Sequence, residues 1–150
     1  QLGKKLEHFT KVLGIKGMGP KTLEKLNLSD ITEIFYLDRD SVISSLNSSV
    51  LTDKLLDEIE KAKNSSFSTV LSSFSIPLIG NTAAEKVASV VSNFEEITVE
   101  KCKEAGLGDK ATANLINWLN TEYIELKDFL PLSFDILINL CLFNYIFNSN

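Results

Sequence analysis

Apolar residues recur along this chain at spacings of three and four, in short runs that polar or glycine-bearing breaks separate. Leu2, Leu6, Phe9 and Leu13 share one face in the first run, which is typical of an amphipathic helix. No stretch before residue 130 alternates apolar and polar residues for long, so strands are not expected there. The pattern predicts an all-α protein, with helical apolar positions in residues 2–13, 23–26, 31–37, 42–46, 51–62, 67–74, 87–94, 99–102 and 115–119.

Several polar residues stand where helices are expected to begin. Asp30 precedes the run at Ile31 and is a suitable N-cap, and Thr82 with Glu85 matches a capping box. In the run over 51–62, the residues Leu51, Leu55, Ile59 and Ala62 lie on one face, which predicts that this face is buried.

A glycine-bearing turn follows the first helix, with Met18 between Gly17 and Gly19 and with Pro20 directly after them. Glycine permits positive φ and a close approach of the backbone to a ligand, and proline suits the first position of a helix. The free N–H groups of that helix start, together with the helix dipole, form an anion site. We predict that the anion is a nucleic-acid phosphate.

Related turns recur, and their last residues are Gly19, Ser48, Gly80 and Gly108, at spacings of 29, 32 and 28 residues. An aliphatic residue stands seven positions after each of them, and a residue suited to starting a helix stands one position after. Such periodicity is the signature of repeated supersecondary units. The chain is therefore expected to contain four helix–turn–helix units in one compact domain.

The four turns differ in their glycine content. The first and fourth have glycine on both sides of an apolar residue and lysine two positions later, at Lys21 and Lys110. The third keeps only Gly80, and the second, Leu46-Asn47-Ser48, has no glycine. Asn47 tolerates a left-handed conformation, but Leu46 does so only at a cost. The second unit is accordingly predicted to be scaffold that holds no phosphate.

Charge is distributed unevenly along the 150 residues. The formal net charge is −5, which by itself argues against nucleic-acid binding, but residues 1–28 carry +4 and the remainder −9. This asymmetry predicts one basic face on an acidic body.

The two cysteines are too few for a disulfide framework or a four-cysteine zinc site, and the cytoplasm is the expected compartment. No apolar run is long enough to span a membrane.

No catalytic or metal-binding set can be assembled from the sequence. His8 is the single histidine and has no Cys, His or carboxylate residues patterned around it, so we expect it to pack on or cap the first helix. Phe94 and Trp118 stand at core spacing and are predicted to be packing residues. We therefore assign no catalytic residue and no metal ligand.

Particular stretches of the chain resemble a known family. These are Gly14–Leu26 around the first turn, the Ile31–Leu37 run, Lys54–Lys63, and Val70 through Gly80. In this order they resemble the helix-hairpin-helix domain of bacterial-type NAD-dependent DNA ligases, over roughly residues 5–122. The second turn departs from the family, which has Gly-Phe-Gly where Leu46-Asn47-Ser48 stands.

The resemblance implies non-sequence-specific binding of nicked duplex DNA through backbone phosphates, as the non-catalytic part of a ligase in DNA replication and repair. It implies a catalytic adenylation domain or subunit as partner and NAD as cofactor of the intact ligase, with no cofactor bound by this chain.

The family's Lys-x-Asp-Gly nucleophile motif is absent, because the sequence contains no Asp-Gly pair. Neither the family's four-cysteine zinc finger nor its C-terminal domain is recognisable, so we expect a fragment or a separate subunit of a split ligase. The residues expected to contact DNA are Lys16, Gly17, Met18, Gly19, Lys21, Thr22, Ile79, Gly80, Asn81, Thr82, Gly106, Leu107, Gly108, Lys110 and Thr112.

The last part of the chain lies outside the resemblance. We place the DNA-binding domain at residues 1–122 and a C-terminal extension at 123–150, in which the run 136–147 is unusually apolar and aromatic. A contiguous apolar surface marks an interaction site when it is exposed. The alternative function is therefore a helix-hairpin-helix scaffold for protein–protein assembly of a DNA-processing complex, with this extension as its docking segment.

Overall fold

Helices and turns form all of the regular structure in residues 1–131, which are the residues that the computed structural model describes. No strand occurs in this range, so the prediction of an all-α fold is confirmed. The elements in chain order are α1 (Leu2–Val12), α2 (Pro20–Leu26), η1 (Ile31–Tyr36), α3 (Arg39–Leu46), α4 (Ser49–Ala62), α5 (Phe67–Ser72), α6 (Asn81–Ala88), η2 (Phe94–Glu96), α7 (Val99–Glu104), α8 (Asp109–Asn120), α9 (Glu122–Leu126) and η3 (Lys127–Phe129).

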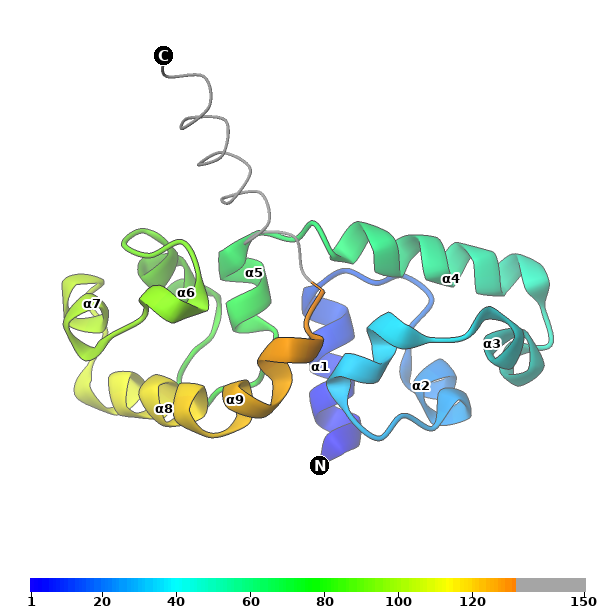
Figure 1. The fold of residues 1–150 in the computed structure, drawn as a ribbon, viewed down its shortest axis with the longest axis horizontal. Coiled ribbons are helices and arrows are strands. Elements are labelled where there is room, and N and C mark those ends of the chain that lie inside the picture. The colour runs from blue at the N-terminus through cyan, green and yellow to red at the C-terminus, as the bar shows by residue number, and fades with distance from the viewer. Residues whose placement is uncertain (132–150) are drawn as a thin grey trace, which may run out of the picture.

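The helices are arranged on two sides of a central pair (Figure 1). Helices α1 and α5 lie in the middle and contact each other, with α2, α3 and α4 on one side and α6, α7 and α8 on the other. Helix α9 returns toward α1, where the Nζ of Lys5 donates to the Oε1 of Glu122 at 3.2 Å. Because α2 and α4 lie on one side of the central pair and α6 and α8 on the other, the first two of the four turns lie on one side of the molecule and the last two on the other.

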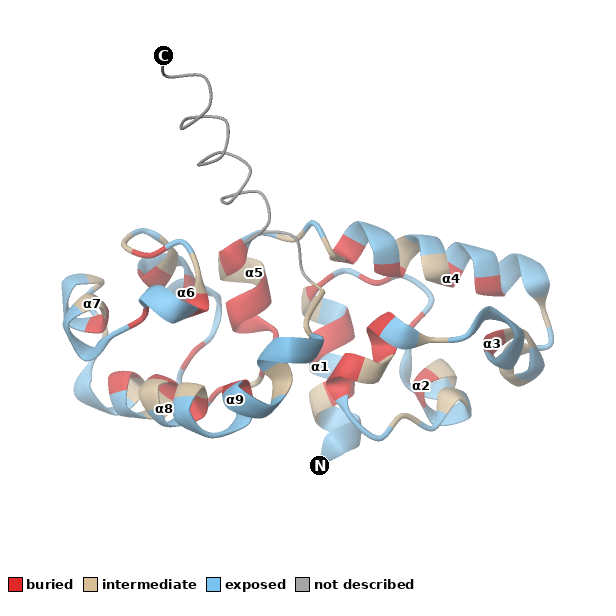
Figure 2. Cartoon of the chain, in the orientation of Figure 1, coloured by how far each residue is buried: buried red, intermediate tan, exposed pale blue. Residues whose placement is uncertain are grey.

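A continuous series of aromatic rings joins the two sides. The ring of Phe9 lies 5.9 Å from that of Phe35 and 5.6 Å from that of Phe74, and Phe74 lies 4.9 Å from Trp118. Phe94 lies 5.8 Å from Trp118, and both are buried, which confirms their prediction as packing residues. Figure 2 shows buried positions on the inward faces of the helices, as expected where one apolar stripe per helix drives packing.

The predicted helix starts are observed at all four turns. Helices α2, α4, α6 and α8 begin one residue after Gly19, Ser48, Gly80 and Gly108, and each of these four residues has extended backbone at the N-cap. Asp30 caps the next element as expected, because its carboxylate accepts from the backbone N–H of Thr32 at 2.7 Å. That element is the 3-10 helix η1, in place of the expected α-helix.

Two local predictions are wrong. Thr82 is the second residue of α6 and caps nothing, because Gly80 occupies the N-cap and the helix begins at Asn81. Leu51 was expected on the buried face of α4 but is 55% exposed, while the side chain of Thr52 is fully buried. The Oγ1 of Thr52 is satisfied there, since it donates to the carbonyl of Ser48 at 2.8 Å.

The helical core extends beyond the predicted boundary at residue 122. Tyr123 on α9 is buried, its ring lies 4.8 Å from that of Phe94, and its hydroxyl donates to the Oε1 of Glu95 at 3.0 Å. Helix α9 therefore belongs to the same core as α8. The apolar run expected at 136–147 lies outside the described residues.

Candidate nucleic-acid interface

The first turn is fixed to α1 and leaves the start of α2 uncapped. Gly17 has φ +86°, a conformation that only glycine adopts at little cost, and the carbonyl of Met18 accepts from the Oγ1 of Thr10 at 3.3 Å. Met18 is 3% exposed, so its side chain packs in the core and little of the residue is accessible to a ligand. No side chain accepts from the first turn of α2, which leaves amide N–H groups after Gly19 available to an anion.

The fourth turn repeats this backbone arrangement. Gly106 also has φ +86°, Gly108 is an extended N-cap, and no side chain caps α8. Lys110 is exposed in the first turn of α8, whereas Thr112 is buried and its hydroxyl has no partner among the described residues. The hydroxyl of Thr112, which was expected to contact DNA, therefore does not face the solvent.

The third turn reaches the same conformation without its first glycine. Leu78 stands where Gly17 and Gly106 stand in the other turns, and it has φ +70° with a side chain that is 63% exposed. Ile79 is buried and Gly80 is the uncapped N-cap of α6. Asn81 and Thr82 are exposed in the first turn of α6, where both side chains are accessible to a ligand.

The second turn differs in the feature that matters most for anion binding. Asn47 adopts the left-handed conformation at φ 55°, as its side chain permits. The Oγ of Ser48 accepts from the backbone N–H of Leu51 at 3.1 Å, so a side chain satisfies one of the first-turn amides of α4. Of these four turns, three therefore precede an uncapped helix start at glycine and one precedes a start that serine caps.

Positive side chains accompany the uncapped starts. Lys16, Lys21 and Lys110 are all exposed, and none of them forms an ion pair within residues 1–131. Thr22 is half-buried on α2 and lines a cleft with Lys16 and Gly17. Asp109, the first residue of α8, is the one acidic residue in the first turns of α2, α6 and α8, and it reduces the attraction of the fourth turn for an anion.

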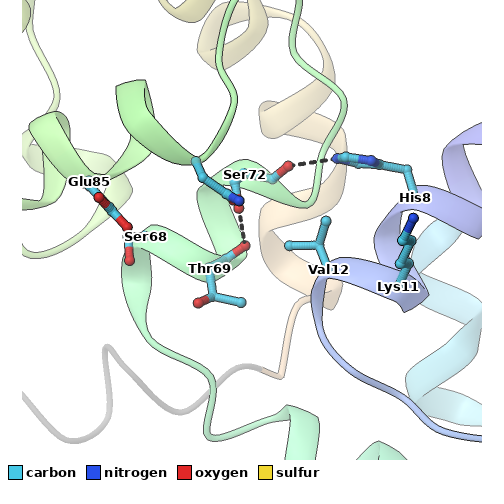
Figure 3. Close-up of a pocket in the computed structure, with 8 residues that line it drawn as sticks. His8, Lys11, Val12, Ser68, Thr69, Ser72 and Glu85 are labelled. Atoms are coloured by element: carbon cyan, nitrogen blue, oxygen red, sulfur yellow. Dashed lines mark hydrogen bonds between the residues drawn. The ribbon is translucent and has the colours of Figure 1, made fainter.

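A polar cleft of about 510 Å³ lies where α1, α5 and α6 meet (Figure 3). The Nε2 of His8 lies 2.8 Å from the carbonyl oxygen of Ser72, so the imidazole joins α1 to α5 as a packing residue would. Lys11, Thr69 and Asn81 line the same cleft. Within residues 1–131, the backbone carbonyl of Ser72 is the hydrogen-bond partner of the His8 ring.

Other classes of site are not formed by the described residues. Within residues 1–131, no three His, Cys, Asp or Glu side chains lie close enough together to hold a metal ion. No helix in that range combines the length and the apolar character that crossing a membrane requires. Cys102 is buried, and this burial raises the pKa of its thiol.

No protein-family model matches the chain. The sequence is similar to proteins named DNA ligase from several bacteria. It is 29% identical to that of Thermosipho africanus over 118 residues, which are 72% of this chain and 18% of the ligase. It is 28% identical to that of Cytophaga hutchinsonii over 134 residues, which are 81% of this chain and 20% of the ligase. It is 29% identical to that of Buchnera aphidicola over 132 residues, which are 80% of this chain and 20% of the ligase. The chain therefore spans about a fifth of the length of the curated relatives it matches.

Proposed function

We propose that this chain is the non-catalytic DNA-binding part of an NAD-dependent DNA ligase. In this proposal its helix-hairpin-helix turns hold the phosphates of nicked duplex DNA, and a separate adenylating part of the enzyme binds NAD and seals the nick. The similarity to DNA ligases over about a fifth of their length supports a partial role of this kind. The absence of an Asp-Gly pair from the sequence supports the location of the nucleophile elsewhere.

The observation that carries the proposal is the difference between the turns. Helices α2, α6 and α8 begin at glycine with no side-chain cap, whereas Ser48 caps α4 with its own hydroxyl. Backbone amides at an uncapped helix start bind a non-bridging phosphate oxygen and read no base identity. Exposed lysines at two of these turns add an attraction to phosphate that weakens as the salt concentration rises. Because amides and lysines both contact phosphates, the expected binding is independent of base sequence.

Titrations with labelled nicked duplex, intact duplex and single-stranded DNA test the proposal. We expect duplex binding that weakens steeply between about 50 and 200 mM salt, as counterion release dictates. If no duplex binds at about 50 mM salt, the proposal is wrong for this chain.

Gly19 and Gly108 can be replaced to test phosphate contact at the turns without disturbing the core. Gly19 and Gly108 have φ values of −80° and −71°, and an added Cβ at either position meets no atom within 4 Å. Gly19→Val combined with Gly108→Val should therefore fold normally while the added side chains obstruct the approach of phosphate. We expect affinity to fall about tenfold or more, which is about 1.4 kcal/mol. Gly3→Val on α1 is the control, and retained affinity in the double variant would exclude the turns as contacts.

A second candidate function is protein–protein assembly. The net charge of −5 favours it, as do two exposed apolar side chains near the end of the described chain, Ile124 at 53% and Phe129 at 56%. Deletion of residues 130–150 combined with Ile124→Ser and Phe129→Ser separates the two functions. Under the assembly hypothesis this combined variant abolishes binding to a ligase adenylation domain, whereas under the DNA hypothesis it leaves DNA affinity intact.

A further inference from the structure

A cleft of about 600 Å³ separates α4 from α2 and the turn that precedes α2. Its walls come from three helices and from the first turn, since Gly17, Lys25, Leu46 and Lys54 all line it. An added Cβ at Gly17 would lie 3.8 Å from the Cδ1 of Leu55, so the turn and α4 approach each other closely at this end. The cleft therefore adjoins the first uncapped helix start.

The charges in this cleft favour an anionic ligand. Lys25 and Lys54 are exposed and have no ion-pair partner within residues 1–131. Lys61 compensates one of the two acidic charges of the cleft, since its Nζ lies 3.1 Å from the Oε2 of Glu58 and 3.6 Å from the Oδ2 of Asp57. The hydrogen bond from Lys61 lowers the pKa of Glu58. Lys16 of the first turn also lines the cleft without an ion pair within residues 1–131, so the three unpaired lysines, from the turn, α2 and α4, outnumber the one remaining acidic charge.

The floor of the cleft is apolar. Leu55 is buried, Leu46 is half-buried, and Leu51 is 55% exposed at a position where a core residue was expected. A rim of unpaired lysines around an aliphatic floor suits a ligand with alternating anionic and apolar parts. The sugar–phosphate backbone of DNA is such a ligand, because each phosphate is separated from the next by the apolar face of a deoxyribose.

We propose that this cleft binds the sugar–phosphate backbone of one DNA strand directly beside the phosphate held at the Gly17–Gly19 turn. The inference rests on the proposed DNA-binding function and extends it to α4, whose capped N-terminus holds no phosphate. Lys25 and Lys54 contact consecutive phosphates, and Leu51 packs against the deoxyribose between them. The second helical unit thus contacts DNA through side chains, in contrast to its expected role as scaffold alone.

Salt titrations of duplex binding test the lysines. Lys25→Gln combined with Lys54→Gln should weaken binding and reduce the slope of log affinity against log salt by about 1.8, which corresponds to two lost phosphate contacts. Lys4→Gln combined with Lys127→Gln removes the same charge at residues that line neither this cleft nor the glycine turns, and should leave the slope almost unchanged. Thermal melting of both variants should match that of the parent, since all four lysines are exposed.

Photo-crosslinking tests the floor independently. A benzophenone amino acid at Leu51 should crosslink to labelled duplex, whereas the same group at Phe129, which is 56% exposed, should not. If the parent binds duplex but the Lys25/Lys54 variant keeps its affinity and slope, the cleft proposal is wrong and the turn-based function stands. A crosslink from residue 51 to an added acidic peptide but not to DNA would also overturn it. Absence of duplex binding by the parent overturns both proposals together.

Discussion

The side chain of Asn114 on α8 donates a hydrogen bond from Nδ2 to the carbonyl oxygen of Pro77 at 2.9 Å. Pro77 directly precedes Leu78 in the third turn, whereas α8 is the helix that begins at the fourth turn. This hydrogen bond therefore connects the third turn to the helix that follows the fourth turn. If both turns hold phosphates of one duplex, this bond helps to fix the distance between the two phosphate sites.

Replacing Asn114 with alanine should destabilise the protein by about 1 kcal/mol, because the hydrogen bond is lost. Asn117→Ala on the same helix is the matched control, since both changes raise helix propensity equally and Asn117 is exposed. Urea unfolding of the two variants measures the difference. Equal stabilities would show that the contact to Pro77 contributes nothing in solution.

The fourth turn offers a test of backbone strain within one hairpin. Alanine at Gly106 must adopt φ +86°, which costs about 1–2 kcal/mol, although an added Cβ meets no atom within 4 Å. Alanine at Gly108 keeps φ −71° and also has open space around it. We expect Gly106→Ala to lower stability by about 1–2 kcal/mol and Gly108→Ala to change it by less than about 0.5 kcal/mol. Comparable losses in the two thermal or urea transitions would contradict the left-handed conformation at Gly106.

Helix starts were predictable because their causes are local. Glycine, serine or aspartate at an N-cap determines the backbone of its neighbours, so the starts of α2, α4 and α8 follow from a few adjacent residues. The capping box at Thr82 failed because two local signals competed there. Gly80 gave the earlier start, and Thr82 became a residue of the first helical turn.

Tertiary features of the site were not predictable in this way. The exposure of Leu51 follows from where α3 packs on α4, which places Thr52 inward instead. The cleft that Lys25 and Lys54 share joins residues 29 positions apart in the sequence, and periodicity gives no information about such a distance. The phosphate-contact assignments of the turns themselves stay predictions until binding is measured.

The position of the domain end leads to a prediction for Tyr123. Tyr123→Ala should cost about 3 kcal/mol, because the ring is buried against Phe94 and lies 5.5 Å from the ring of Trp118. Phe129→Ala, six residues later, removes a ring that is 56% exposed and should cost less than about 0.5 kcal/mol. Denaturant unfolding distinguishes them. A small loss for Tyr123→Ala would return the domain boundary to residue 122.

Leu78 should be replaceable with a gain in stability. A leucine at φ +70° carries a conformational cost of about 1–2 kcal/mol, and with 63% of its surface exposed it recovers little through burial. Asparagine already occupies two other left-handed positions of this chain, Asn27 at φ 52° and Asn47 at φ 55°. Leu78→Asn should therefore raise the free energy of unfolding by roughly 0.5–1 kcal/mol.

Leu51→Asn is the control, because Leu51 is similarly exposed but helical, and the same change there should lower stability by a few tenths of a kcal/mol. If Leu78→Asn is destabilising, then the exposed leucine makes contacts that compensate for its backbone strain.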